Sequence, residues 1–157
     1  MKTLKYFCYT LCIVFSSLLC GCNQEDDINE IFVSGEWLLV NYYTGIDWNS
    51  NNDRYARPAY TEAQDLETLG KITITFDSDG TFNGTLDGGT FEGKWQANPK
   101  DRSFAVIGEI KTSISLSGKN AEFIKKLKLA SYYKGNSRGF LQLAPDARTT
   151  YMQFTHK

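Results

Sequence analysis

The sequence predicts a mainly β protein, an antiparallel meander of about eight or nine strands that forms a partly closed barrel or a sandwich, with one packed α-helix late in the chain. Residues 71–95 (KITITFDSDGTFNGTLDGGTFEGKW) hold three short alternating runs separated by two Asp/Gly turns, which is typical of such a meander. Residues 118–130 change to helical spacing. The length of 157 residues fits one domain.

The first 21 residues are expected to be a lipoprotein signal peptide. Lys2 and Lys5 give a positive start, and the mainly apolar run 6–19 is shorter than the roughly 20 residues that a transmembrane helix needs. Gly21 before Cys22 resembles the bacterial lipobox, in which a small residue precedes the acylated cysteine. Cys22 is therefore the expected lipidation site, with acyl chains such as palmitate holding the protein to a membrane. An ordinary secretory signal cut elsewhere is the alternative.

This processing changes what the mature chain can do. The remaining cysteines, Cys8, Cys12 and Cys20, leave with the signal, so disulfides, zinc–thiolate sites and cysteine nucleophiles are excluded. Loss of Lys2 and Lys5 lowers the net charge of −1 by two, to −3, which gives no argument for nucleic-acid binding. We expect no cofactor and no nucleic-acid partner.

Residues 22–33 are expected to form the acylated cysteine and an acidic tether, with residues 23–29 extended and solvated. Glu25, Asp26 and Asp27 resemble the acidic surface-export signals of some Gram-negative lipoproteins. The sequence supports equally well a second interpretation of these residues, a polar spacer that holds the domain away from the lipid.

Residues 34–157 are expected to form the β domain. Its first strand is predicted over residues 35–43, with Trp37 and Leu39 on one face. The connection 44–70 is unusually long, and its second half has helix signals: Thr61 as a cap with Gln64 three residues on, and Gly70 as a stop.

The meander follows. Ile72, Ile74 and Phe76 alternate with polar residues, and residues 77–80 and 87–89 supply the two turns. On the third strand Phe91, Gly93 and Trp95 share one face, and Glu92 and Lys94 share the other.

The rest of the chain is predicted as strands around one helix. Strands are expected at residues 103–107 and 109–116, the latter with Ile110, Ile114 and Leu116 inward. The helix 118–130 has Asn120 as its expected cap and an apolar stripe of Phe123, Ile124 and Leu127. Further strands are expected at residues 131–133, 140–143 and 149–154.

This order of elements resembles the META domain, the HslJ-like family of bacterial envelope proteins. The resemblance covers residues 34–156 and rests on the order of short motifs: Gly35, Trp37 and Leu39; Ile72 to Gly80; Phe91 and Gly93; Glu122, Phe123 and Leu127; Tyr132 and Tyr133; and Leu141, Leu143 and Phe154. It implies an envelope role without a settled chemistry. Typical members carry Gly-Cys-Asn and a later cysteine where this chain has residues 87–89 and 115–117.

Lipocalin-like lipoproteins are the second resemblance. They share the Gly-x-Trp first strand and the Asp-Gly-Thr and Gly-x-Trp meander, here at residues 79–81 and 93–95. This resemblance implies a hollow barrel that carries a small apolar ligand.

The connection after the first strand is the candidate ligand or partner surface. Tyrosine, tryptophan and arginine side chains gather there among asparagines, which suits sugar, aromatic or protein binding. The alternative is that these rings fold back and plug one end of the barrel. The candidate residues are Tyr42, Tyr43, Trp48, Arg54, Tyr55, Arg57 and Tyr60.

No catalytic or metal residue is predicted. The one histidine, His156, lies next to the C-terminal residue on an expected frayed tail, which argues against a catalytic triad. Asp77, Asp79 and Asp87 lack the spacing of an EF-hand and suit hairpin turns.

We therefore expect a non-enzymatic, lipid-anchored cell-envelope protein on the outer membrane of a Gram-negative bacterium, on either side of it. Its expected partners are the membrane, through the lipid, and an envelope glycan or protein. The alternative is the lipocalin-like carrier. A solid core of Trp37, Phe76, Phe91 and Trp95 would argue against the carrier, and an internal pocket of roughly 300 Å³ or more would favour it.

Overall fold

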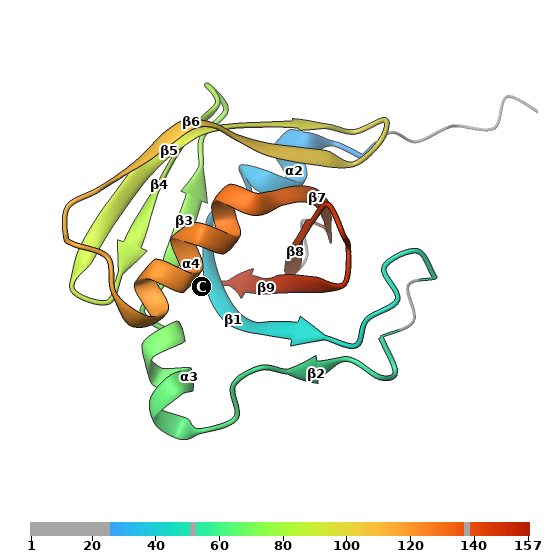
Figure 1. Ribbon diagram of the computed structural model, residues 1–157. Helices are drawn as coiled ribbons and strands as arrows, with labels where there is room; N and C mark the ends of the chain where they lie inside the picture. The colour runs from blue at the N-terminus through green and yellow to red at the C-terminus, as the bar shows by residue number, and fades with distance from the viewer. Residues whose placement is uncertain (1–25, 51–52, 137–138) are drawn as a thin grey trace, which may run out of the picture.

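The strands form one antiparallel sheet that closes on itself. The computed structural model describes residues 26–50, 53–136 and 139–157 (Figure 1). Its nine strands lie in the order β2-β1-β3-β4-β5-β6-β7-β8-β9, and β1 also pairs with β9, which closes a ring that is not a regular barrel. The predicted mainly β fold of eight or nine strands is confirmed. The strands are β1 (Glu36–Thr44), β2 (Arg57–Pro58), β3 (Thr73–Phe76), β4 (Thr81–Leu86), β5 (Gly89–Asn98), β6 (Ser103–Thr112), β7 (Ala130–Asn136), β8 (Phe140–Pro145) and β9 (Thr150–His156).

Strand β1 closes the ring because it has two neighbours. Its first residues pair with β3, as in Trp37 with Ile74, and it pairs with β9 along most of its length. A bulge shifts the β1–β9 register between Leu39 and Asn41. The seam between β6 and β7 is much weaker, since one pair of residues, Ser103 and Tyr132, joins these strands.

The meander 71–95 forms as predicted, and its glycines have a packing role. Gly80 and Gly88 adopt positive φ angles of 84° and 86° in the two turns. Phe82 pairs across strands with Gly93, and Phe91 pairs with Gly84. Each phenyl ring lies so close to its glycine partner that a β carbon there would stand within 2.6 Å of the ring. The two pairs therefore require glycine.

Aromatic side chains fill the interior of the ring. Trp37, Phe76, Phe91 and Trp95, the side chains whose packing distinguishes a solid core from a carrier's hollow interior, are 0%, 1%, 2% and 7% exposed. Phe32 adds a further buried ring, with centroid distances of 5.1 Å to Phe76, 4.8 Å to Trp95, 5.7 Å to Phe104 and 5.0 Å to Tyr133.

Phe32 belongs to a short helix, α2 (Ile28–Phe32), which the sequence analysis did not predict. Residues 23–29 were expected to be extended, but Asp27 caps this helix by accepting hydrogen bonds from the backbone N–H groups of Asn29 and Glu30. The cap directs Ile31 and Phe32 into the core, where both are buried.

Helix α3 (Ala63–Leu69) lies in the long connection as predicted and ends at Gly70. Its N-cap is Glu62 and not Thr61. Helix α4 (Gly118–Leu129) buries Phe123, Ile124 and Leu127 as predicted. The expected cap was wrong, because helix α4 begins two residues before Asn120.

Asn120 instead fastens helix α4 to the turn between β4 and β5. Its side-chain amide donates to the carbonyl oxygen of Asp87 at 2.9 Å, and its side-chain oxygen accepts from the Asp87 N–H at 3.1 Å.

The two strands expected at residues 103–107 and 109–116 are one strand, β6, interrupted by a bulge. Glu92 pairs with Lys111 and Lys94 pairs with Ile107, so Gly93 faces three residues of β6. Gly108 adopts a φ of 73° in this bulge. Strand β6 ends at Thr112, and Leu116 is 39% exposed instead of inward.

Candidate functional site

The structure separates the seven residues of the candidate surface. Tyr42 and Trp48 are buried, at 2% and 8% exposure, and Tyr43 and Tyr60 are half-buried. Tyr55 is 70% exposed, and Arg54 and Arg57 beside it are also exposed. Of the predicted set, these three side chains lie on the outside of the molecule.

Tyr42 and Tyr60 are held in place by the bulge of β1. After the bulge both Asn41 and Tyr42 are buried. The side-chain amide of Asn41 donates to the carbonyl oxygen of Tyr60 at 2.7 Å and accepts from its N–H at 3.2 Å. The Tyr60 hydroxyl donates to Glu122 of α4 at 2.5 Å, and this hydrogen bond raises the pKa of Tyr60 to about 12. These contacts hold the 44–70 connection, through Tyr60, against helix α4.

Trp48 lies in a separate apolar cluster, with Ala144 and Tyr151. These side chains alternate with core residues on β8 and β9, so the cluster covers the outer face of the sheet. Lys134 lies 4.3 Å from the centroid of the Trp48 ring and donates to the Trp48 carbonyl oxygen. The connection thus folds back onto the outside of the ring of strands.

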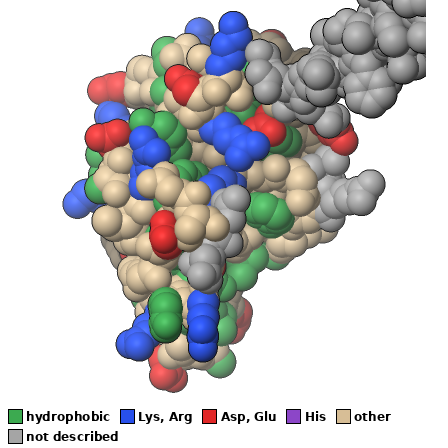
Figure 2. Space-filling view, turned by 90° about the vertical axis from the view of Figure 1, so that its right-hand side faces the viewer, with side chains coloured by type: hydrophobic (Ala, Val, Ile, Leu, Met, Phe, Trp, Pro, Cys, Tyr) green, Lys and Arg blue, Asp and Glu red, His purple; other side chains and the backbone are tan. Residues whose placement is uncertain are grey.

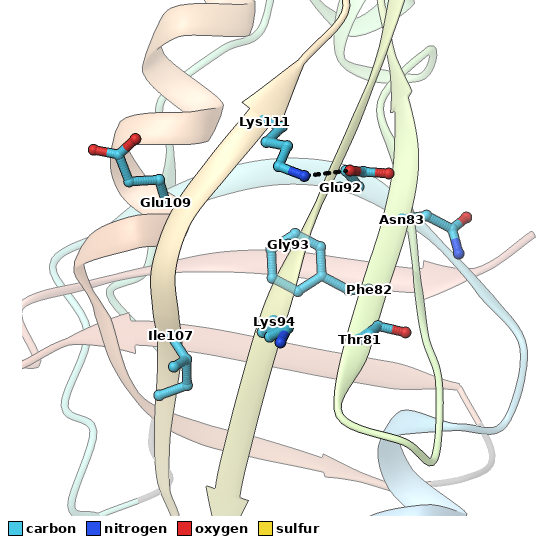
Figure 3. A pocket seen from close by; sticks show the side chains of 9 residues that line it. All are labelled: Thr81, Phe82, Asn83, Glu92, Gly93, Lys94, Ile107, Glu109 and Lys111. Carbon is cyan, nitrogen blue, oxygen red and sulfur yellow. Dashed lines mark hydrogen bonds and ion pairs between the residues drawn. The ribbon is translucent and has the colours of Figure 1, made fainter.

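Two neighbouring hollows lie on the outer face of β3–β6. The hollows have volumes of about 480 Å³ and 470 Å³ and share Asn83, Glu92 and Lys111 in their walls, and we call them together the outer groove. Figure 3 shows the residues that line the first of the two. Its other side chains include hydroxyl groups of Thr75, Thr81, Thr85, Thr90 and Ser113, the carboxylates of Glu36 and Glu109, and the ammonium group of Lys94.

The alternation of β4 and β5 places these polar groups outside. Phe82 and Phe91 point inward, and Asn83 and Glu92 are exposed. The bulge of β6 then bends the neighbouring strand, with Glu109 within it. Lys111 and Glu92 face each other across the groove at 3.3 Å, a solvent-exposed pair that contributes little to stability.

Hydrogen bonds support the floor of the outer groove. Thr73 and Thr85 hydroxyl groups lie 2.9 Å apart, and Thr73 is buried. A hydrogen bond with Thr73 also lowers the pKa of the Glu36 carboxyl below its usual range. Glu36 is therefore an ionised acceptor at neutral pH. The alternation of residues 90–95 predicts Glu92 and Lys94 on one face, but no local pattern predicts that Asn83 and β6 lie beside them.

A second, smaller polar hollow of about 270 Å³ lies on the other side of the ring. Arg102, Lys134, Asp53, Gln142 and Phe140 line it, together with Gly135. Burial lowers the pKa of the Lys134 ammonium group, and the nearby carboxylate of Asp53 opposes this shift. Figure 2 shows lysine and arginine side chains gathered near the centre of this side of the molecule.

His156 does not lie on a frayed tail, because it is the last residue of β9 and pairs with Trp37. Its ring stacks on Trp37 at a centroid distance of 3.9 Å, and its Nε2 lies 3.3 Å from the Ser34 hydroxyl.

Asp79 has the expected turn role, since its carboxylate accepts from the N–H and hydroxyl of Thr81.

The described residues contain no cluster of three or more His, Cys, Asp or Glu side chains suited to a metal ion. They also contain no helix with the length and apolar character needed to cross a membrane. The expected signal peptide, Cys22 and Glu25 lie outside the described residues.

The family described as "Domain of unknown function (DUF4847)" matches residues 23–156. The chain belongs to the DUF4847 family. A crystal structure of a DUF4847 family protein from Bacteroides vulgatus ATCC 8482 is similar, with 34% sequence identity and a TM-score of 0.70, covering 83% of this chain and 97% of that one. The family shown is DUF4847, and neither the META family nor a lipocalin-like family is shown.

A protein from Burkholderia xenovorans, solved by NMR, shares the fold of this DUF4847 chain. It is 15% identical, with a TM-score of 0.51, and the match covers 80% of this chain and 83% of that one. No curated protein matches the chain.

Proposed function

We propose that this DUF4847 protein is a lipid-anchored, non-enzymatic binding module of a Gram-negative cell envelope, and that its outer groove binds an envelope glycan. The N-terminal sequence supports the anchor, with Gly21 before Cys22 and a short apolar run ahead of them. The outer groove is the observation that carries the binding role. It joins two hollows, each large enough for a small ligand, on a rigid sheet.

The filled interior supports binding on the outside of the ring over binding within it. A carrier would need an internal pocket of roughly 300 Å³ or more. The side chains of Phe32, Trp37, Phe76, Phe91 and Trp95 occupy the interior.

The groups in the outer groove match the chemistry of a glycan. Sugar hydroxyl groups both donate and accept hydrogen bonds, and the threonine hydroxyls and the Asn83 amide do the same. Glu36 and Glu92 add strong acceptors.

A distant relationship to the META or lipocalin-like families stays a hypothesis, supported by the β meander and the late helix α4.

The anchor is tested by expressing the full chain and its Cys22→Ala variant in a Gram-negative host. Mass spectrometry of the membrane fraction should show an acylated N-terminal cysteine in the chain without the substitution. The Cys22→Ala variant should lose the acyl mass and leave the membrane. Acylation that survives in Cys22→Ala would refute the assignment of the anchor.

Glycan binding is tested with the full chain in detergent, titrated with peptidoglycan fragments and with purified surface polysaccharide. Asn83→Ala and Glu92→Ala should each weaken binding about tenfold, since each removes a hydrogen bond to the sugar. Glu67→Ala on exposed α3 is the matched control and should bind normally. Loss of binding in Tyr55→Ala alone would contradict the outer groove and assign the ligand to the predicted Arg54–Tyr55–Arg57 surface.

A further inference from the structure

The first described residue, Asp26, contacts the β domain through an ion pair and a hydrogen bond. Its carboxylate makes two contacts with the Arg102 guanidinium, 2.7 Å to Nε and 3.1 Å to Nη2, and it accepts from the Tyr133 hydroxyl at 3.4 Å. Arg102 lies in the turn between β5 and β6 with a positive φ of 54°. A two-point contact of this kind sets the direction as well as the strength of the interaction.

This contact limits how far the domain can stand from its anchor. Four residue steps separate Cys22 from Asp26, and a fully extended chain spans about 3.5 Å for each residue, so the two α carbons lie within about 14 Å. With Cys22 acylated, as the proposed function requires, Arg102 must stay close to the headgroup layer of the membrane. Figure 1 shows α2 at this end of the molecule and α3 at the opposite end.

Arg102 is also one wall of the smaller polar hollow, which we call the headgroup pocket. Lys134 supplies a second cation there, held by the Trp48 carbonyl oxygen. Asp53 supplies one carboxylate, which accepts from the Tyr151 hydroxyl at 3.2 Å. Gln142 adds an amide that is buried against Gln153 at 2.9 Å. The phenyl ring of Phe140 lies in the wall and is 37% exposed.

We propose that the headgroup pocket receives the zwitterionic headgroup of a phosphoethanolamine lipid from the membrane that holds Cys22. The lipid phosphate binds Arg102 and Lys134, and its ammonium group binds Asp53. Phe140 contacts the apolar part of the lipid, as aromatic rings do at membrane interfaces. A headgroup with negative charge alone would leave the Asp53 carboxylate facing that charge, so the mixed charges of the pocket favour a zwitterion.

Photo-cross-linking tests this proposal in the acylated full chain. A photoreactive benzoylphenylalanine replaces Phe140 and, as the matched control, Ile107, which is 42% exposed on the outer groove. Each protein is reconstituted in vesicles of equal parts phosphatidylethanolamine and phosphatidylglycerol, irradiated and analysed by mass spectrometry. The Phe140 position should cross-link to phosphatidylethanolamine, and the Ile107 position should not.

Substitutions of Lys134 then test the phosphate contact. Lys134→Gln should lower the cross-linking yield about tenfold, because it loses the charge-assisted hydrogen bond to the lipid phosphate. Lys134→Arg keeps this hydrogen bond and should retain the yield. Equal yields at Phe140 and Ile107, or a preference for phosphatidylglycerol, would overturn the headgroup pocket while leaving the anchor intact. If the chain without substitutions is recovered with no acyl group on Cys22, the proposed anchor is contradicted, and the headgroup-pocket proposal is contradicted with it.

Discussion

The phenyl ring of Phe82 lies across Gly93 on the neighbouring strand, so that a β carbon on Gly93 would stand 2.5 Å from the Phe82 Cζ atom. The same arrangement recurs between Phe91 and Gly84, where the distance would be 2.6 Å. Each ring covers the backbone of a residue that has no side chain. These pairs let the inner face of the meander pack closely against the core while its outer face forms the floor of the outer groove.

Gly93→Ala should therefore destabilise the protein. The added methyl group must displace a fully buried ring, and overpacking of this kind costs about 1–3 kcal/mol. Urea unfolding followed by tryptophan fluorescence measures the loss. Gly139→Ala is the matched control, because no atom of the described residues lies within 4 Å of its added carbon and its φ lies outside the left-handed region. Equal stability of the two variants would show that Phe82 moves aside without cost.

Phe32→Ala should be among the most destabilising single changes in the chain. The side chain is fully buried among four aromatic rings, and removal of such a ring costs about 3–5 kcal/mol. Phe140→Ala, at an exposed ring, should cost much less. Thermal unfolding by circular dichroism checks both. A small loss for Phe32→Ala would mean that α2 is peripheral to the core.

Asn41→Ala should loosen the long connection more than it loosens the sheet. The substitution leaves the N–H and carbonyl groups of Tyr60 without their partner, at a cost of about 1–3 kcal/mol. Hydrogen–deuterium exchange should rise at Tyr60 and in β2 while β4 and β5 stay protected. Unchanged exchange at Tyr60 would contradict the role assigned to Asn41.

Stability should fall as the pH rises from about 10 towards 12. The pKa of Tyr60 is raised from 10.0 to about 12 in the folded protein, first by its hydrogen bond to Glu122, so above pH 10 the unfolded state loses a proton that the folded state keeps. Below pH 10 this stabilisation is fully present. Urea unfolding at pH 9 and pH 11 measures the decrease, which should be smaller in Glu122→Gln because an amide perturbs the phenol less. The same decrease in both proteins would exclude Glu122 as its cause.

Local patterns were sufficient to predict the meander and helix α4, but they left open whether the interior is filled or hollow. In residues 71–95 the alternation and the Asp/Gly turns act between neighbours in sequence, so they appear directly in the chain. The core aromatics Trp37 and Trp95 follow from the same alternation.

Contacts between distant residues could not be predicted in this way. Asn41 and Asn120 have the sequence signals of a surface amide and a helix cap, yet each fastens a segment far away in the chain. The headgroup pocket needs Arg102 and Lys134 to meet across the weak β6–β7 seam. The outer groove depends on the bulge of β6, where Gly108 was the one local signal.

The pairing of β1 with β9 has a consequence for how the protein is made. The ring joins residues at both ends of the domain, such as Trp37 and His156, so it closes only after the last strand has left the ribosome. Until then β1 has an open edge along most of its length, and open edges invite pairing with other chains. A chain that stops before residue 150 should therefore aggregate, even though it contains every aromatic residue of the meander.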